Sequence, residues 1–267
     1  MLNVNLCQLK SVIPTEAVYK QVGDKALHLY IFPPKGEVKG CVINIHGGGW
    51  RAETPKRLFP HAAYFSENDA LGICVEYRLH DVAKGYDVRD CLEDCVDALL
   101  FVRKYVRDTY GDVPITALGD SAGGYLAVCL GCQTILDRIR PDVQRADFVV
   151  DLNGIVDLTG KWSYAIDKKA SDTDNQQTLQ MLYSPLYNVK ADDAPVLLMH
   201  GDTDEIVALE DSKKYNEELK TKGIKSELVV LEKARHAFIL FDYEHDNQFV
   251  ADILYKVALI LKGNGVL

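Results

Sequence analysis

Gly119-Asp120-Ser121-Ala122-Gly123-Gly124 is the stretch of sequence that decides the fold. It follows an apolar run that ends at Leu118, and a helical pattern begins at Tyr125. A serine with a small residue two positions away on each side is typical of a sharp turn from a strand into a helix, where larger neighbours would clash with the strained backbone. Such a turn exposes the hydroxyl at the carboxyl edge of a sheet. This context favours Ser121 as a nucleophile over a chance match in a loop.

Around this turn, apolar runs of strand length alternate with longer helical patterns. We predict strands at 42–45, 71–75, 113–118, 148–150, 196–199 and 228–231, and helices at 56–68, 88–106, 122–139, 209–222 and 249–261. The alternation predicts an α/β fold, in which a mostly parallel central sheet is covered by helices on both faces. Because there is no internal repeat and no linker rich in proline or glycine, residues 1–267 are expected to form a single domain.

A second glycine-rich stretch, His46-Gly47-Gly48-Gly49-Trp50, directly follows the predicted strand 42–45. Glycines allow consecutive backbone N–H groups to point into one space, as a developing oxyanion requires. A phosphate-binding loop is the alternative, but the sequence has neither G-x-G-x-x-G nor a Gly-Lys-Ser/Thr ending here. We therefore predict that the N–H groups of Gly48, Gly49 and Ala122 form an oxyanion hole. His46 is expected to hold the loop by hydrogen bonding.

Two loops that follow predicted strands can supply a base and an acid. The strand at 196–199 is followed by His200-Gly201-Asp202-Thr203-Asp204, and the strand at 228–231 is followed by a loop that contains His236. A serine nucleophile needs a histidine as its base, and the histidine needs an acid that orients it. Since both loops lie at the same sheet edge as Ser121, we predict a triad of Ser121, Asp204 and His236.

Each of these assignments has an alternative in the sequence. Asp202 competes with Asp204 for the role of the acid, but Asp204 lies farther along the loop and we expect Asp202 to stabilise its own turn by hydrogen bonding. His200 ends a strand, which is typical of a core histidine. His245 precedes the last predicted helix and is expected at the surface.

Residues 159–186 interrupt the alternation with a polar stretch that also contains several aromatic side chains. A segment of this kind between two core strands is a candidate lid over a site. We predict Trp50 as a substrate-binding residue. Trp50, Trp162 and Tyr183 could all stack on a sugar or on an aromatic acyl group, and ordinary packing is the alternative for each.

The composition excludes several classes of protein. The chain has 267 residues, of which 48% are hydrophobic, and a net charge of −9. The negative charge argues against nucleic acid and anionic membrane surfaces as partners. No window approaches 18 consecutive apolar residues, so no membrane span is predicted. The first six residues lack the pattern of a secretory signal. We expect a cytoplasmic protein, and a leader removed from a longer precursor is also compatible with the sequence.

The cysteines give a further clue about the compartment. Their number, seven, is odd, and several lie in apolar periodic segments, which favours reduced thiols over a disulfide framework. The pairs Cys91-x₃-Cys95 and Cys129-x₂-Cys132 resemble spaced metal ligands. Both pairs lie on predicted buried helices without a nearby histidine, so we expect core thiols and no metal site.

Together these motifs resemble α/β-hydrolase esterases of the hormone-sensitive-lipase-like and bacterial carbohydrate-esterase-like (acetyl or feruloyl) type. The resemblance covers most of the chain, from Tyr19 to Leu261, and it includes two more motifs besides those above, Tyr77-Arg78-Leu79 and Ser184-Pro185-Leu186. It implies an α/β-hydrolase fold with no cofactor, in which Ser121, Asp204 and His236 match the catalytic triad. Gly48, Gly49 and Ala122 match the oxyanion donors.

The resemblance implies a serine carboxylesterase for short-chain acyl esters, and we expect acetyl or feruloyl esters on plant carbohydrate. The partner would then be a small-molecule or oligosaccharide ester, and the oligomeric state stays open. Two features depart from the family: Arg235 precedes His236 where a glycine is usual, and the segment before the first core strand is too short for a large cap. The missing cap argues against long-chain lipids, which need a deep apolar channel.

Three other functions use a related fold. An amidase of the arylformamidase type has the same triad and a similar glycine-rich loop. A peptidase of the prolyl-oligopeptidase type usually has an additional domain, which this chain lacks. A non-catalytic ligand-binding α/β-hydrolase is the third, although all three triad residues are present here.

Overall fold

The computed structural model describes residue 9 and residues 12–34, 36–240 and 247–267. Cys7, His245 and residues 1–6 lie outside the described residues, so the expectations for them are not addressed. The described residues form an eight-stranded sheet in the order β1-β2-β4-β3-β5-β6-β7-β8. Its strands are β1 (Thr15–Val22), β2 (Lys25–Phe32), β3 (Gly40–Ile45), β4 (Ala70–Val75), β5 (Ile115–Asp120), β6 (Phe148–Leu152), β7 (Val196–Gly201) and β8 (Ser226–Leu231).

Most of this sheet is parallel, as the sequence predicts. The six strands from β4 to β8 in the sheet order all pair in parallel. In the strands β3, β4, β5 and β7 every residue is buried, which is why each is an apolar run without alternation. The result is the α/β-hydrolase arrangement that the motifs imply.

The hairpin of β1 and β2 was not predicted from the sequence. Both of its pairings, β1 with β2 and β2 with β4, are antiparallel. β1 is largely exposed, so its hydrophobic pattern is weak. The signal that could have revealed the hairpin is the Gly23-Asp24 pair between the two strands, because Gly23 takes a positive φ of 56° at the turn.

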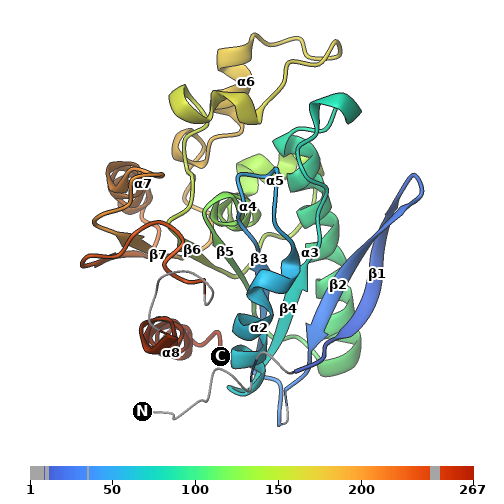
Figure 1. The fold of residues 1–267 in the computed structure, drawn as a ribbon, viewed down its shortest axis with the longest axis vertical. Helices are drawn as coiled ribbons and strands as arrows, with labels where there is room; N and C mark the ends of the chain where they lie inside the picture. The colour runs from blue at the N-terminus through green and yellow to red at the C-terminus, as the bar shows by residue number, and fades with distance from the viewer. Residues whose placement is uncertain (1–8, 10–11, 35, 241–246) are drawn as a thin grey trace.

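Helices cover the sheet on both faces, which confirms the predicted layers. The helices are α2 (Phe59–Ser66), α3 (Val88–Tyr110), α4 (Ala122–Gly131), α5 (Gln133–Ile139), α6 (Gln176–Leu182), α7 (Leu209–Thr221) and α8 (Asn247–Gly263). Buried side chains of α3, α4, α5 and α7 share one apolar core, and those of α2 and α8 share a second core on the other face. Figure 1 shows α2 in front of the sheet and α3 behind it.

The single helix expected at 122–139 is two helices. α4 ends at Gly131, Cys132 has an extended backbone (φ −100°, ψ 102°), and α5 starts at Gln133. Gly131 packs so closely that a Cβ there would lie 2.4 Å from the side chain of Val149. The Asp193 carboxylate then accepts the N–H of Gln133 at 2.9 Å, so the second helix starts from a fixed point.

The segment 159–186 contains α6 and the short 3₁₀ helices η3 (Gly160–Ala165) and η4 (Pro185–Tyr187). It forms the top of the molecule in Figure 1, above α4 and α5. Ion pairs fix it to the first turn of α3: Arg89 binds Asp172 at 2.8 Å, and Lys169 binds Asp90 at 2.8 Å. Whether this segment moves as a lid stays a prediction.

The described cysteines are core side chains. Six of them, at positions 41, 74, 91, 95, 129 and 132, are buried and unpaired. Burial raises the pKa of the thiols, most of them well above the ordinary value. The spaced pairs on α3 and near the end of α4 are therefore the core thiols that the helical pattern predicts. Among the described residues no helix is long and apolar enough to cross a membrane.

Candidate active site

Ser121 occupies the turn between the end of β5 and the start of α4. Its backbone is strained, with φ 53° and ψ −119°. The turn closes only because two glycines flank it. A Cβ on Gly119 would lie 2.1 Å from the carbonyl oxygen of Gly123, and a Cβ on Gly123 would lie 2.0 Å from that of Ile45. The Ser121 N–H donates to Leu152 O at 2.9 Å, which fixes the turn to β6.

The structure brings Ser121, His236 and Asp204 together in one chain of hydrogen bonds. The Oγ of Ser121 lies 2.8 Å from Nε2 of His236, and Nδ1 of His236 lies 2.7 Å from Oδ2 of Asp204. A carboxylate only accepts, so Nδ1 carries the hydrogen and the neutral ring presents the lone pair of Nε2 to the serine hydroxyl. This arrangement allows His236 to accept a proton from Ser121.

Asp204 is held by its own loop as well as by His236. Its Oδ1 accepts the N–H groups of Ile206 and Val207 at 2.8 and 2.9 Å, and its side chain is fully buried. Burial alone would raise the pKa of this carboxyl, but hydrogen bonds from His200, His236 and Val207 outweigh it and hold the pKa well below the usual range. Asp204 therefore stays ionised next to the imidazole.

Asp202 does not hold its own turn, contrary to the sequence-based expectation. Its Oδ1 accepts the N–H of Lys233 at 2.6 Å and so links the β7–α7 loop to the loop that carries His236. Within the described residues His236 has no hydrogen bond to Asp202. His200 is a buried core histidine, as expected: Nδ1 lies 2.8 Å from Ser212 Oγ, and Nε2 lies 3.0 Å from Val207 O.

The N–H groups predicted as oxyanion donors are available. Gly48 and Gly49 both have a positive φ, 97° and 61°, which turns the loop after β3 toward Ser121. Among the hydrogen bonds of the described residues, none uses the N–H of Gly48, Gly49 or Ala122. Ala122 is also the first residue of α4, where the helix dipole favours negative charge. The arrangement can accept an anionic oxygen next to the serine.

Three side chains hold this glycine loop in place. The Gly47 N–H donates to Oδ1 of Asp120 at 3.0 Å. The ring of His46 stacks on Tyr77 with 4.4 Å between centroids, and the Tyr77 hydroxyl donates to His46 O at 2.8 Å. Burial lowers the pKa of His46 to about 4, so the ring is neutral near pH 7. His46 thus holds the loop, as its position in the sequence suggests.

Trp50 is buried and does not line the cavity at Ser121, so the prediction that it binds the substrate is wrong. Its side chain is 0% exposed, and its indole N–H donates to Ala122 O at 3.0 Å. The ring packs edge-on against Tyr125 and Trp162. Trp50 therefore fixes the glycine loop against the start of α4. The aromatic side chain that reaches the cavity is Trp162 of η3.

A cavity of about 320 Å³ opens onto the Ser121 hydroxyl. Part of its wall is apolar, formed by Trp162, Ile206, Ala237 and Leu240. The rest includes the glycine loop and an ion pair that sequence analysis missed, in which Arg57 Nε lies 3.2 Å from Glu53 Oε2. The two charged residues are four positions apart just after the glycine loop, and this spacing is the only sequence signal for them.

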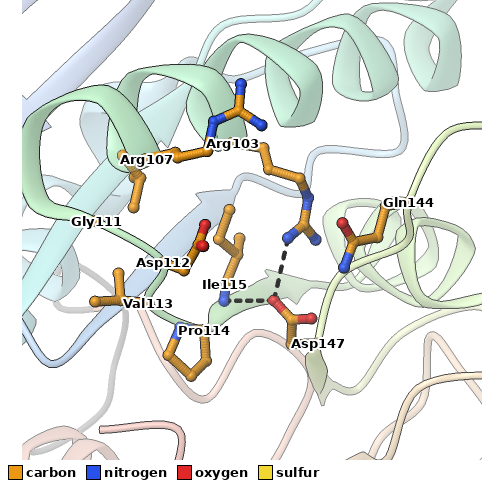
Figure 2. A pocket seen from close by; sticks show the side chains of 10 residues that line it. Arg103, Arg107, Gly111, Asp112, Val113, Pro114, Ile115, Gln144 and Asp147 are labelled. Carbon is orange, nitrogen blue, oxygen red and sulfur yellow. Dashed lines mark hydrogen bonds and ion pairs between the residues drawn. The ribbon is translucent and has the colours of Figure 1, made fainter.

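A cavity of about 470 Å³ lies at the other end of β5. Figure 2 shows Asp147 between Arg103 and Ile115, the first residue of the strand. Asp147 Oδ2 accepts the Ile115 N–H at 2.8 Å and the Arg103 guanidinium at 3.4 Å. Ser121 lies six positions after Ile115 along extended chain, a distance of about 20 Å. This cavity is therefore separate from the serine site.

The fold and the site together define the chain as an α/β-hydrolase with the site of a serine ester hydrolase. The sequence model of the BD-FAE family matches residues 27–219, more than half of the chain. The protein therefore belongs to the BD-FAE family, which is a family of α/β-hydrolase esterases.

Relatives and solved structures agree with this class. The chain is 36% identical over 135 residues to neutral cholesterol ester hydrolase 1 from Pongo abelii, and 23% identical over 244 residues to a probable isoprenylcysteine alpha-carbonyl methylesterase from Arabidopsis thaliana. These matches cover 43% and 82% of this chain, but only 32% and 50% of the relatives' own length. Propionate-bound esterase 2 of Thermogutta terrifontis is 26% identical, with a TM-score of 0.80 and 95% of both chains covered.

Proposed function

We propose that the protein is a serine carboxylesterase for short-chain acyl esters, with acetyl or feruloyl esters of plant carbohydrate as its substrates. The observation that carries the proposal is the hydrogen-bonded chain Ser121–His236–Asp204, which opens onto a small cavity beside free backbone N–H groups. The substrate is a small molecule or an oligosaccharide, in line with a net charge of −9 that disfavours polyanionic partners.

In the proposed mechanism, Ser121 Oγ attacks the ester carbonyl while His236 Nε2 takes its proton. The Asp204 carboxylate holds the ring and stabilises the imidazolium. The carbonyl oxygen becomes an oxyanion and accepts the N–H groups of Gly48, Gly49 and Ala122, each contributing on the order of 3 kcal/mol in the transition state. His236 then protonates the leaving alcohol. Water, activated by the same histidine, hydrolyses the acyl-enzyme and restores the serine.

The size and the lining of the cavity support short acyl groups. A volume of about 320 Å³ is at the small end of the range for ligand sites. The esterase 2 of Thermogutta terrifontis, 25% identical to this chain, has been solved with butyrate bound, which supports an acyl group of this length. A long-chain lipid would need a longer apolar channel than these walls provide.

Two features of the wall support a carbohydrate as the alcohol. Trp162 offers an aromatic face on which the apolar side of a sugar ring can stack. The Glu53–Arg57 pair offers a carboxylate that accepts from sugar hydroxyls and a guanidinium that donates to them. Because Trp162 belongs to the segment 159–186, that segment shapes the site whether or not it moves.

The test is a comparison of kcat/KM for p-nitrophenyl esters from acetate to octanoate, together with acetate release from acetylated xylo-oligosaccharide. We expect a steep fall beyond butyrate, release of acetate, and at least about a thousandfold loss of kcat in Ser121→Ala. A flat profile without acetate release would contradict the carbohydrate assignment. Faster turnover of N-formylkynurenine than of aryl acetate would favour an amidase instead. A loss of less than tenfold in Ser121→Ala would place the nucleophile elsewhere.

Trp162 supplies a sharper test of the sugar site. Trp162→Ala should raise KM for the acetylated oligosaccharide by about fivefold, since a stacking face is worth on the order of 1 kcal/mol, and leave kcat/KM for p-nitrophenyl acetate within about threefold. Trp162→Phe, which keeps an aromatic face, is the matched control. Equal losses on both substrates would show that Trp162 only supports the fold.

A further inference from the structure

Asp204 contacts two imidazoles, and only one of them belongs to the proposed triad. Oδ2 of Asp204 lies 2.7 Å from Nδ1 of His236 and 3.3 Å from Nε2 of His200. His200 is 0% exposed and lies on β7, one residue before the end of the strand. Its ring therefore approaches the carboxylate from inside the protein, while His236 faces the cavity.

The partners of the His200 ring fix its protonation on the side of Asp204. Nε2 faces only acceptors, the Val207 carbonyl oxygen at 3.0 Å and the Asp204 carboxylate. Nε2 must therefore carry a hydrogen. Nδ1 faces the hydroxyl of Ser212 on α7 at 2.8 Å, which can donate or accept. The ring is thus held between α7 and the β7–α7 loop with its Nε2–H directed at Asp204.

We infer that His200 is a positioning residue of the reaction. Its Nε2–H fixes the Asp204 carboxylate and, because it approaches the same oxygen as His236, reduces how strongly Asp204 stabilises a positive charge on His236. The inference rests on the proposed function, because it assumes that Asp204 and His236 act on Ser121. A carboxylate that accepts a hydrogen bond from one imidazole stabilises the positive charge on a second imidazole less. His200 thereby tunes how readily His236 holds its proton, without touching the substrate.

The charges around His200 support an electrostatic role. The ring contacts the ionised carboxylate of Asp204 on the β7–α7 loop and also interacts electrostatically with the carboxyl groups of Asp151 on β6 and Asp211 on α7. Burial alone would lower the pKa of His200, but the hydrogen bonds to Asp204 and to Val207 O outweigh it and raise the pKa. The raised pKa favours the charged form of the His200 ring, and the charged ring interacts more strongly with the Asp204 carboxylate.

Two amide variants separate positioning from mere packing. His200→Asn places an amide near Nδ1, where it can reach Ser212 but not Asp204, whereas His200→Gln places one near Nε2, where it can reach Asp204. We expect His200→Asn to lower kcat/KM by about tenfold or more, because a displaced acid misaligns the histidine. We also expect the acidic limb of its pH profile to move to higher pH, by about half a unit or more. His200→Gln should lie closer to the unchanged enzyme in both measurements.

Ser212→Ala is the control for packing between β7 and α7, because it removes the Nδ1 contact and leaves Nε2 in place. Its acidic limb should not move. The low-field proton resonance of the His236 Nδ1–H, which should shift in His200→Asn and not in Ser212→Ala, reads the same contact in any folded variant without turnover. An unmoved limb and resonance in His200→Asn, or equal changes in the Asn and Gln variants, would overturn the inference.

Ser121→Ala, measured in parallel, separates this inference from the proposed function. If Ser121→Ala keeps its activity within tenfold, the proposed function fails. If Ser121→Ala is inactive and His200→Asn has the pH profile of the unchanged enzyme, only the role of His200 fails.

Discussion

The two ends of β5 differ in how their polar groups are satisfied. At the amino end, in the larger cavity shown in Figure 2, Asp147 accepts both the Ile115 N–H and the Arg103 guanidinium. At the carboxyl end, Ser121 has a strained backbone beside N–H groups that have no acceptor among the described residues. Two buried carboxyls there, Asp120 and Asp151, have pKa values that burial raises to about 6 and about 7.

This difference shows which features distinguish a candidate active site from a cavity without one. The larger cavity, about 470 Å³, is at the end where Asp147 accepts from both Ile115 and Arg103. The smaller one, about 320 Å³, is at the end where the backbone N–H groups of Gly48, Gly49 and Ala122 have no acceptor among the described residues. Volume therefore does not identify the reactive end of the strand. Strain and unsatisfied polar groups do, because both cost stability and persist only where surrounding structure holds them.

The largest effect is expected at the carboxyl end, when the acid Asp204 is replaced. Asp204→Asn should lower kcat by about a thousandfold to ten-thousandfold, because an amide cannot both accept from His236 Nδ1 and stabilise the imidazolium. Asp202→Asn is the matched control on the same loop. It keeps an oxygen for the Lys233 N–H, so kcat should stay within about threefold of the unchanged enzyme. Steady-state kinetics on p-nitrophenyl acetate measures both, and the reverse order would move the acid to Asp202.

A second test measures what the carboxyl end costs in stability. An unfolded aspartate loses its proton near pH 4, whereas burial makes folded Asp151 keep its proton to about pH 7. The folded state therefore binds the extra proton between these two pH values. The stability linked to it is complete below pH 4 and is lost as the pH rises through 7.

Asp151→Asn removes this titration. Relative to the unchanged protein, its thermal midpoint should be similar at pH 4 and higher at pH 8, by an amount equivalent to on the order of 4 kcal/mol. Thermal unfolding between pH 4 and pH 8 measures the difference. A midpoint difference that does not depend on pH would contradict the raised pKa of Asp151.

The smallest expected effect on activity is at the amino end. Asp147→Ala removes the acceptor of the Ile115 N–H and the partner of Arg103, at a cost of about 1–3 kcal/mol in the free energy of unfolding. kcat/KM, measured well below the thermal midpoint, should stay within twofold. A larger loss of activity would mean that the two ends of β5 are coupled and that the amino end is not independent of the serine site.

The parts of the fold and site that could be predicted follow local rules. The Ser121 turn combines a strand, small residues and a helix within about ten positions, and each of these is visible in sequence. Asp204 and His236 could be placed near it because every parallel strand ends at the same edge of the sheet. Their pairing, at 2.7 Å, needed the structure, because Asp202 is only two residues away.

What could not be predicted depends on which way a side chain points. Trp50 and Trp162 are the same residue type, yet one is buried under the glycine loop and the other faces the cavity. The contact between His200 and Asp204 depends on the shape of an irregular loop, which spacing alone does not determine. Arg57 and Glu53 lie beyond the recognised motif, so only the folded cavity shows that they line it.

The glycines around Ser121 have a consequence for how such a protein can diverge. Gly119 and Gly123 take no part in the chemistry, yet any side chain there would overlap backbone atoms of their neighbours. In a library that samples every substitution, these positions should tolerate as little change as the nucleophile itself. Trp162 and Glu53 line the cavity without holding this turn, so substrate preference can drift there while the turn stays fixed. Because the turn at Ser121 is so tightly packed, substitutions that change substrate preference are expected in the cavity wall.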